Sequence, residues 1–148
     1  MKLAFTKGSG KYDFMEVVRP NCKPEHVDCP KQRIIPHDMV HYAVEHTLQV
    51  RGFLAKVKAG ESADFQMEPD GESNSVERLV EVVQADEWSG GCSSAADIID
   101  MYQVTCRARE CAALPLDAAA VQAVRAAIAD LTQRWEAIPV GGTLHLAL

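Results

Sequence analysis

The chain closes with the stretch VQAVRAAIADLTQRWEAIPVGGTLHLAL (residues 121–148), which decides the fold class that we expect. Its apolar residues recur at alternating steps of three and four, the period of one helix face; they are Val121, Val124, Ile128, Leu131, Trp135 and Ile138. Gly141-Gly142 then breaks the helix, and residues 143–148 carry leucine at every second position, as in a β-strand. A terminal strand is ordered when it joins a sheet, so its partners should lie elsewhere in the chain.

The same apolar stripe has two interpretations. It is either part of the core of one domain or the seam of a coiled-coil homodimer. The stripe covers fewer than three heptads, whereas a stable seam usually needs more. We therefore favour a buried core and a monomer, with a homodimer as the alternative. Asp117 is expected to cap this helix at its N-terminus.

Partners for the closing strand are found at the other end of the chain. Residues 2–7 and 12–19 are typical of two strands, and Gly8-Ser9-Gly10 between them supplies a turn. Residues 20–36 contain four prolines and are predicted to be a loop. The sequence thus predicts an α+β fold in a single domain, residues 1–148, in which a small antiparallel sheet packs against about four main helices.

The middle of the chain is predicted to be helical. We expect helices over residues 36–51, ending at Gly52, over about 74–88, and over 94–112, with a short helical turn at 53–59. Asn74 is the predicted N-cap of the second of these, with Glu77 as its capping-box partner. Residues 61–73 are acidic and contain Pro69-Asp70-Gly71, so they are predicted to be a mobile loop.

Composition limits the classes of function. The chain has 148 residues, 47% of them hydrophobic, and a formal net charge of -6, which suits one soluble domain. An acidic chain without a basic face is a poor nucleic-acid binder. No apolar stretch approaches the roughly 20 residues that span a bilayer. The N-terminal residues turn polar too early for a signal peptide. We therefore expect a cytoplasmic protein with neither nucleic acid nor membrane as a partner.

The five cysteines support the same location. They are Cys22, Cys29, Cys92, Cys106 and Cys111, an odd number that favours reduced thiols over a disulfide framework. None of them forms a Cys-x-x-Cys pair, so the spacing is weak for a cysteine zinc site.

The predicted helix 36–51 is the segment most suited to chemistry, because it holds three of the five histidines. A helical wheel places Val40 and Val44 on the buried face, with His37 and His41 stacked one turn apart at its edge. Asp38 and Glu45 fall further round, toward solvent. Two histidines at this spacing bind one metal ion in metalloprotease helices.

The segment His37-Asp38-Met39-Val40-His41 resembles the zincin motif His-Glu-x-x-His, with aspartate in place of the general-base glutamate. The resemblance covers five residues, and the shorter aspartate weakens its catalytic part. We predict that His37 and His41 bind zinc or another divalent metal. Glu45, four residues beyond His41, would orient that imidazole, because it lies too far along the helix to be a ligand itself. The third ligand stays open among His145, His26 and Cys29.

An alternative needs no metal. His37 and His41 would be half-buried structural residues, Asp38 would complement the helix dipole, and the chain would be a non-enzymatic interaction or regulatory module. Whether the protein is an enzyme stays undecided on either interpretation.

Residues 2–60 also resemble a family of small uncharacterised bacterial proteins. These proteins carry a hairpin, then Pro/Leu-His-Asp-Leu-x-His-Tyr-x-Val-Glu, then a segment close to Gly-Phe-x-Gly-x-Val-Ala-x-Gly. The matching residues are His37-Asp38, His41-Tyr42, Val44-Glu45, Gly52-Phe53 and Ala59-Gly60. Leu54-Ala55 departs from the pattern, because a glycine often follows the phenylalanine there. The resemblance implies a bacterial origin and the hairpin-then-helix order, and it implies no activity.

Overall fold

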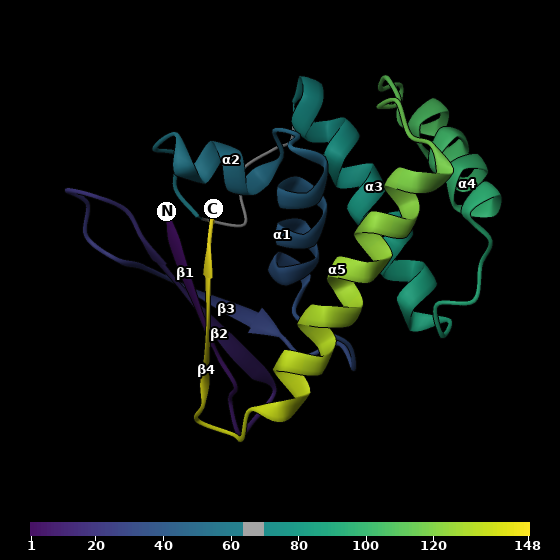
Figure 1. The fold of residues 1–148 in the computed structure, drawn as a ribbon. Coiled ribbons are helices and arrows are strands. Elements are labelled where there is room, and N and C mark those ends of the chain that lie inside the picture. The colour runs from purple at the N-terminus through teal and green to yellow at the C-terminus, as the bar shows by residue number, and fades with distance from the viewer. Residues whose placement is uncertain (64–69) are drawn as a thin grey trace.

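The fold places a sheet on one side of the molecule and the helices on the other (Figure 1). The computed structural model describes residues 1–63 and 70–148. Its elements in chain order are β1 (Lys2–Thr6), β2 (Tyr12–Val18), β3 (Glu25–Pro30), α1 (His37–Leu48), α2 (Phe53–Lys58), α3 (Gly71–Trp88), α4 (Ala95–Ala108), α5 (Ala118–Ala137) and β4 (Thr143–Ala147). The predicted α+β class is confirmed.

The sheet is antiparallel, with the strand order β3-β2-β1-β4. The predicted pairing of the closing strand with the N-terminal hairpin is confirmed, since Leu3 of β1 stands opposite Leu146 of β4. The two chain ends therefore lie side by side, and the amino group of Met1 donates to the carbonyl of Leu148 at 2.9 Å (Figure 1).

The predicted loop 20–36 was wrong over residues 25–30, which form β3. Val27 and Cys29 alternate with exposed residues and are buried, so this edge strand has the period of two that a half-buried strand requires. Its proline, Pro30, is the last residue of the strand, where an edge position tolerates the missing N–H. The four prolines of residues 20–36 led to the prediction of a loop where a short strand is present.

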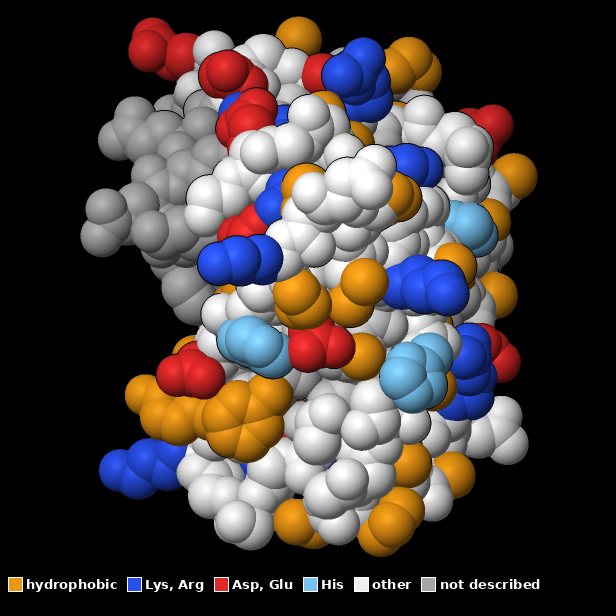
Figure 2. Space-filling model, turned by 90° about the vertical axis from the view of Figure 1, so that its left-hand side faces the viewer, with side chains coloured by type: hydrophobic (Ala, Val, Ile, Leu, Met, Phe, Trp, Pro, Cys, Tyr) orange, Lys and Arg blue, Asp and Glu red, His pale blue; other side chains and the backbone are white. Residues whose placement is uncertain are grey.

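One face of the sheet is open. Along β2, buried Asp13, Met15 and Val17 alternate with residues of the opposite face, of which Tyr12 and Phe14 are each 46% exposed. Figure 2 views the molecule from the side of the sheet and shows one compact group of hydrophobic side chains near an edge. The rest of that view is a mixture of polar, charged and histidine side chains with scattered hydrophobic ones.

The helix ends partly follow the predicted caps. The side chain of Asp117 accepts from Ala120 N at 2.8 Å, and Ser94 caps α4. However, α1 ends at Leu48, three residues before the predicted end, because Gln49 adopts the left-handed conformation. Similarly, α4 ends at Ala108 rather than Ala112.

The start of α3 was also predicted wrongly. The helix begins at Gly71, and Asp70, not Asn74, is its N-cap, with Ser73 completing the capping box. The loop therefore ends at Asp70, three residues earlier than predicted, and the central part of the predicted loop, residues 64–69, lies outside the described residues. The earlier start leaves Glu77 in the second turn of α3, away from any cap.

The apolar stripe of α5 is core. Five of its six members are buried, and Ile138 packs against them at the helix end; the five are Val121, Val124, Ile128, Leu131 and Trp135. The stripe is thus covered by the chain's own elements, so it offers no seam to a second copy. Over the described residues, no helix combines the length and the apolar character needed to cross a bilayer.

Candidate metal centre

The two predicted histidines lie one turn apart on α1, and their ring centroids are 4.8 Å apart with the ring planes nearly perpendicular. Their burial differs more than the helical wheel predicts. The His41 side chain is 2% exposed and the His37 side chain is 35% exposed. His37 therefore forms the border with solvent, whereas His41 lies in the interior.

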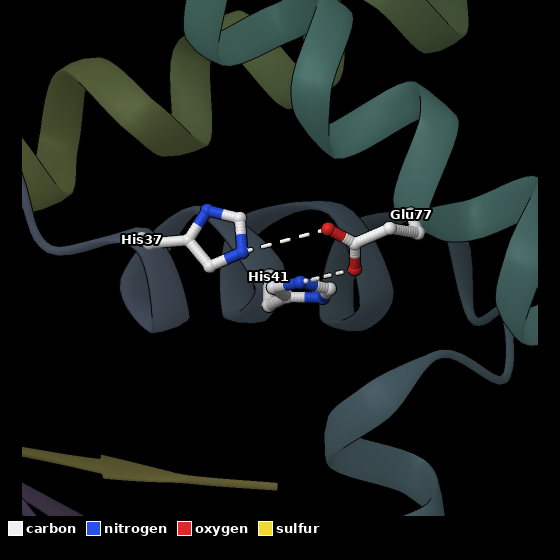
Figure 3. A group of neighbouring side chains, drawn as sticks. All are labelled: His37, His41 and Glu77. Carbon is white, nitrogen blue, oxygen red and sulfur yellow. Dashed lines mark ion pairs between the residues drawn. The ribbon is translucent and has the colours of Figure 1, made fainter. Parts of the chain in front are cut away.

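A carboxylate from another helix faces both rings. Glu77 of α3 directs one oxygen to each imidazole (Figure 3). Its Oε2 is 2.9 Å from Nε2 of His41, and its Oε1 is 3.6 Å from Nε2 of His37. Ligand atoms from the three residues all lie within 4.8 Å of one another. Glu77, which was predicted as a capping residue and not as a ligand, is thus the third member of this group.

The other ring nitrogen of His37, Nδ1, has a hydrogen-bond partner that fixes which nitrogen carries the proton. Gln32 Nε2 donates to the carbonyl of Ile35 at 2.8 Å and also to Gln84 Oε1 at 3.1 Å. Gln84 Oε1 is therefore an acceptor, and it lies 2.9 Å from Nδ1 of His37. Nδ1 must then carry a proton, so a neutral His37 keeps the lone pair on Nε2, toward Glu77.

His41 is arranged in the same way by a second carboxylate. Its Nδ1 lies 3.2 Å from Glu45 Oε1, which as an ionised carboxylate only accepts. The prediction that Glu45 lies toward solvent is wrong, because it is buried with 4% exposure. The predicted contact with His41 is present. Both imidazoles thus point Nε2 at Glu77 and are held from behind through Nδ1, as metal-binding histidines usually are.

Glu45 is held in turn by the start of α2. Its carboxylate accepts from three backbone N–H groups, those of Gly52 (3.1 Å), Leu54 (3.0 Å) and Ala55 (2.9 Å). These donors have no partner within their own helix, so a buried carboxylate satisfies them at little cost. Gly52 permits this approach, since a Cβ there would stand 2.6 Å from Glu45 Oε1 and 2.6 Å from Val76 Cγ1.

The remaining predicted residues are elsewhere. Asp38 is buried instead of facing solvent, and it accepts from the Cys29 thiol at 3.6 Å. Burial, followed by the charge of Asp38, raises the pKa of Cys29, so this thiol is a poor ligand. His26 pairs with Glu16 on the open face of the sheet, and His145 stands on β4 opposite Ala4. None of the three proposed third ligands joins the group found within the described residues.

When no ion is bound, the contacts within the cluster shift the pKa values of all three side chains. Burial lowers the pKa of His41, but its hydrogen bonds with Glu45 and Glu77 outweigh burial and raise the pKa to about 10. The pKa of His37 is likewise raised, since Glu77 and Gln84 outweigh burial. Burial raises the pKa of Glu77, but the two histidines hold it well below its usual range. In the absence of an ion, a proton on Nε2 of His41 therefore lies between that atom and Glu77.

A recognisable signal for Glu77 existed in the sequence. Ser73, Glu77, Val80 and Gln84 follow one another at steps of four, three and four, which places polar residues in the buried stripe of a helix. Ser73 and Gln84 are buried in the structure, and Glu77 is 20% exposed. Buried polar residues need partners; Ser73 has its partner in the capping box of α3, whereas Glu77 and Gln84 face α1.

Comparisons with known proteins do not indicate a function for this chain. No protein-family model, no curated protein and no solved structure matches this chain. The fold and the site together define an α+β protein with a His-His-Glu cluster between two helices.

Proposed function

We propose that the protein binds one divalent transition-metal ion, with zinc as the expected ion, through His37 Nε2, His41 Nε2 and a carboxylate oxygen of Glu77. Two imidazoles and one carboxylate form a recurrent ligand set of zinc, and the same set also binds iron(II). A metal ion is small enough to replace the Nε2 protons between these atoms.

The observation that carries the proposal is the direction of the two rings. Each Nδ1 has an acceptor behind it, Gln84 or Glu45, so each Nε2 is free to present a lone pair to the same point. Atoms bound to one zinc ion stand roughly 3–3.5 Å apart, given bond lengths of about 2.0–2.2 Å. Glu77 reaches His41 through Oε2 at 2.9 Å and His37 through Oε1 at 3.6 Å, and one ligand atom from each of the three residues lies within 4.8 Å of the others, so a bound ion would draw the three groups closer together.

Three protein ligands would leave a fourth position to water. His37 and Glu77 are the partly exposed members, so that position faces solvent. A metal-bound water is a nucleophile near neutral pH, which would make hydrolysis accessible. We propose metal binding as the function and assign no particular reaction to the site. Asp38, the residue in the zincin glutamate's place, is engaged by Cys29 and is given no role in catalysis.

A second candidate function rests on the same contacts. Both ring nitrogens of His41 already have carboxylate partners, so a protonated His41 is satisfied without a metal and ties α1 to α2 and α3. The protein would then be a non-enzymatic interaction or regulatory module, and the exposed Tyr12 and Phe14 of β2 would be the natural contact residues. On either candidate we place the protein in the cytoplasm as a monomer, with neither nucleic acid nor membrane as a partner.

Metal binding separates the two candidates. Protein purified without a histidine tag is stripped with chelator, and its zinc affinity is measured by titration calorimetry for wild type, His37→Ala and Glu77→Gln. Wild type should bind one equivalent, and both variants should lose roughly 100-fold or more in affinity, because even supporting groups behind ligands cost 10–100-fold. His145→Ala and His26→Ala, which remove histidines outside the cluster, are the controls and should bind normally. Sub-stoichiometric zinc that is the same in all five proteins would reject metal binding and favour the structural role.

A further inference from the structure

A second group of reactive side chains lies where α4 ends, beside the first turns of α3. The helix closes with a Schellman motif, in which a residue in the left-handed conformation follows the cap. Glu110 has a φ of 53°, its N–H donates to the carbonyl of Arg107 at 3.2 Å, and Cys111 N donates to the carbonyl of Cys106 at 3.0 Å. These are the two backbone hydrogen bonds that define the motif.

The Schellman motif places particular side chains in contact. The residue after the left-handed position usually packs on the residue five positions earlier, through an apolar contact. Here both residues are cysteines, Cys106 and Cys111. Cys106 is buried with 1% exposure, and Cys111 is partly buried and packs against the same core. The backbone turn therefore holds two thiols together without help from any other segment.

We propose that Cys106 and Cys111 are a dithiol that a low-molecular-weight disulfide, such as oxidised glutathione, converts reversibly to an intramolecular disulfide. The proposal concerns a site separate from the histidine cluster and does not depend on metal binding. Intracellular disulfides are usually transient and redox-sensing, and this pair is suited to that use, because one backbone turn already brings the two cysteines together.

The accessible thiol is the one that reacts first. Cys111 lines an open hollow of about 420 Å³, together with Ser75 and Asn74 of α3 and residues 110–115, which has room for a small thiol. The Cys111 thiolate attacks one sulfur of the small disulfide, the S–S bond breaks, and one small thiol leaves with the proton from Cys111. The product is a mixed disulfide on Cys111.

The buried thiol completes the reaction. Cys106 attacks Sγ of Cys111, the Cys106–Cys111 bond forms, and the second small thiol leaves with the proton from Cys106. The two protein thiols lose two electrons, and the small disulfide is reduced to two thiols. Burial raises the pKa of the Cys106 thiol, while the neighbouring Tyr102 side chain and the charge of Arg78 act against burial. Arg78 Nε is a buried donor without a partner among the described residues, so a cationic group is close to the place where Cys106 becomes a thiolate.

Peptide mapping tests the pairing directly. Arg107 and Arg109 lie between the two cysteines, so trypsin separates them, but residues 79–107 also contain Cys92. The experiment therefore uses Cys92→Ser, which removes an exposed cysteine outside the pair. The folded protein is treated with oxidised glutathione, the remaining thiols are alkylated, and the digest is analysed by mass spectrometry. We expect the peptide 79–107 joined to the peptide 110–125, and dithiothreitol should release both.

Single-cysteine variants on the same background assign the order of the steps. Cys106→Ser should stop at glutathione bound to Cys111, and Cys111→Ser should leave the buried Cys106 unmodified. Should Cys106→Ser fail to fold, Cys111→Ser and the joined peptide still decide the result. Glutathione that stays on Cys111 while Cys106 is present would overturn the proposal. The same holds if Cys22 is modified while Cys106 and Cys111 remain thiols.

Discussion

Two carboxylates of the same helix, partly buried Glu77 and buried Asp86 of α3, have opposite kinds of partner. Asp86 Oδ2 accepts from the guanidinium of Arg125 at 2.8 Å, and its Oδ1 accepts from Ser93 N at 3.1 Å. Arg125 also donates to the carbonyl of Ser93. An arginine stays protonated at any pH at which the protein folds, so the cation beside Asp86 is permanent.

Glu77 faces two imidazoles, whose Nε2 protons can leave. A carboxylate charge on α3 is therefore balanced by a fixed cation at Asp86 and by groups with exchangeable protons at Glu77. A permanent ion pair joins α3 to α5 at Asp86, whereas the cluster at Glu77 joins α3 to α1 and accepts a metal ion in place of protons. The comparison predicts which perturbations affect each carboxylate.

The largest contrast should be in the pH dependence of metal-free protein. The pKa of His41 is raised to about 10 in the folded state, from an ordinary 6.5. The folded state therefore holds an extra proton, whose stabilisation is complete below pH 6.5 and is lost as the pH rises toward 10. The free energy of unfolding, measured with urea, should fall over this window by up to about 1.4 kcal/mol per pH unit.

Glu77→Gln supplies the control for that slope. Without the second carboxylate the proton on His41 is held less firmly, so the slope between pH 6.5 and 10 should become shallower. Asp86 has a lowered pKa, because Ser93 and Arg125 outweigh its burial, so its contribution is lost only on acidification, below the ordinary carboxyl range. A wild-type stability that is flat from pH 6.5 to 10 would show that His41 carries no extra proton.

The second prediction removes the fixed ion pair. Asp86→Ala leaves Arg125 without its carboxylate, and losing one partner of a buried pair costs about 3–5 kcal/mol. We expect about 3 kcal/mol in urea unfolding, because the Arg125 side chain is 19% exposed, and zinc affinity should be unchanged. Asp130→Ala breaks the exposed pair with Arg134 and should cost about 0.5 kcal/mol or less. Loss of zinc binding in Asp86→Ala with the fold intact would contradict the separation of the two sites.

The third prediction concerns the group behind His41. Glu45→Gln keeps the shape of the side chain but removes the charge that makes Nδ1 a donor and Nε2 a ligand. Zinc affinity should fall about 10–100-fold, as for other carboxylates behind ligating histidines. Titration calorimetry measures the change, with Glu16→Gln, the partner of exposed His26, as the matched control. Equal zinc affinity in Glu45→Gln and wild type would remove Glu45 from the site.

The smallest effect is expected at Gly52. A methyl group there meets Glu45 Oε1 and Val76 Cγ1 at 2.6 Å, so Glu45 has to move. Gly52→Ala should destabilise by about 1–2 kcal/mol, the range for adding a methyl group to a packed site, and weaken zinc binding less than Glu45→Gln does. Gly10→Ala, whose Cβ would meet no atom within 4 Å, is the matched control for thermal unfolding. Equal melting temperatures for the two variants would show that Glu45 has room to move.

Local sequence patterns predicted the helices and strands better than they predicted the burial of individual side chains. The cap at Asp117 was predicted correctly because a cap depends on residues three positions away, whereas the cap predicted at Asn74 was wrong because α3 begins earlier, at Gly71. The burial of Asp38 and Glu45 was predicted wrongly because a helical wheel assumes one covered face, whereas α1 contacts α2, α3 and α5. A helix surrounded on several sides buries its polar residues too, and each then needs a partner.

The sequence by itself determined the α+β class, the buried stripe of α5, the pairing of the closing strand with the hairpin, and the stacking of His37 and His41. The strand pairing follows from the need of a terminal strand to join a sheet, and the others follow from a repeat of two or of 3.6 residues or from neighbours within one turn. Only the tertiary structure decided that Glu77 completes the histidine pair and that Glu45 spans His41 and the start of α2. These contacts join residues on separate helices, and the packing of the helices sets their separations, which no local period encodes.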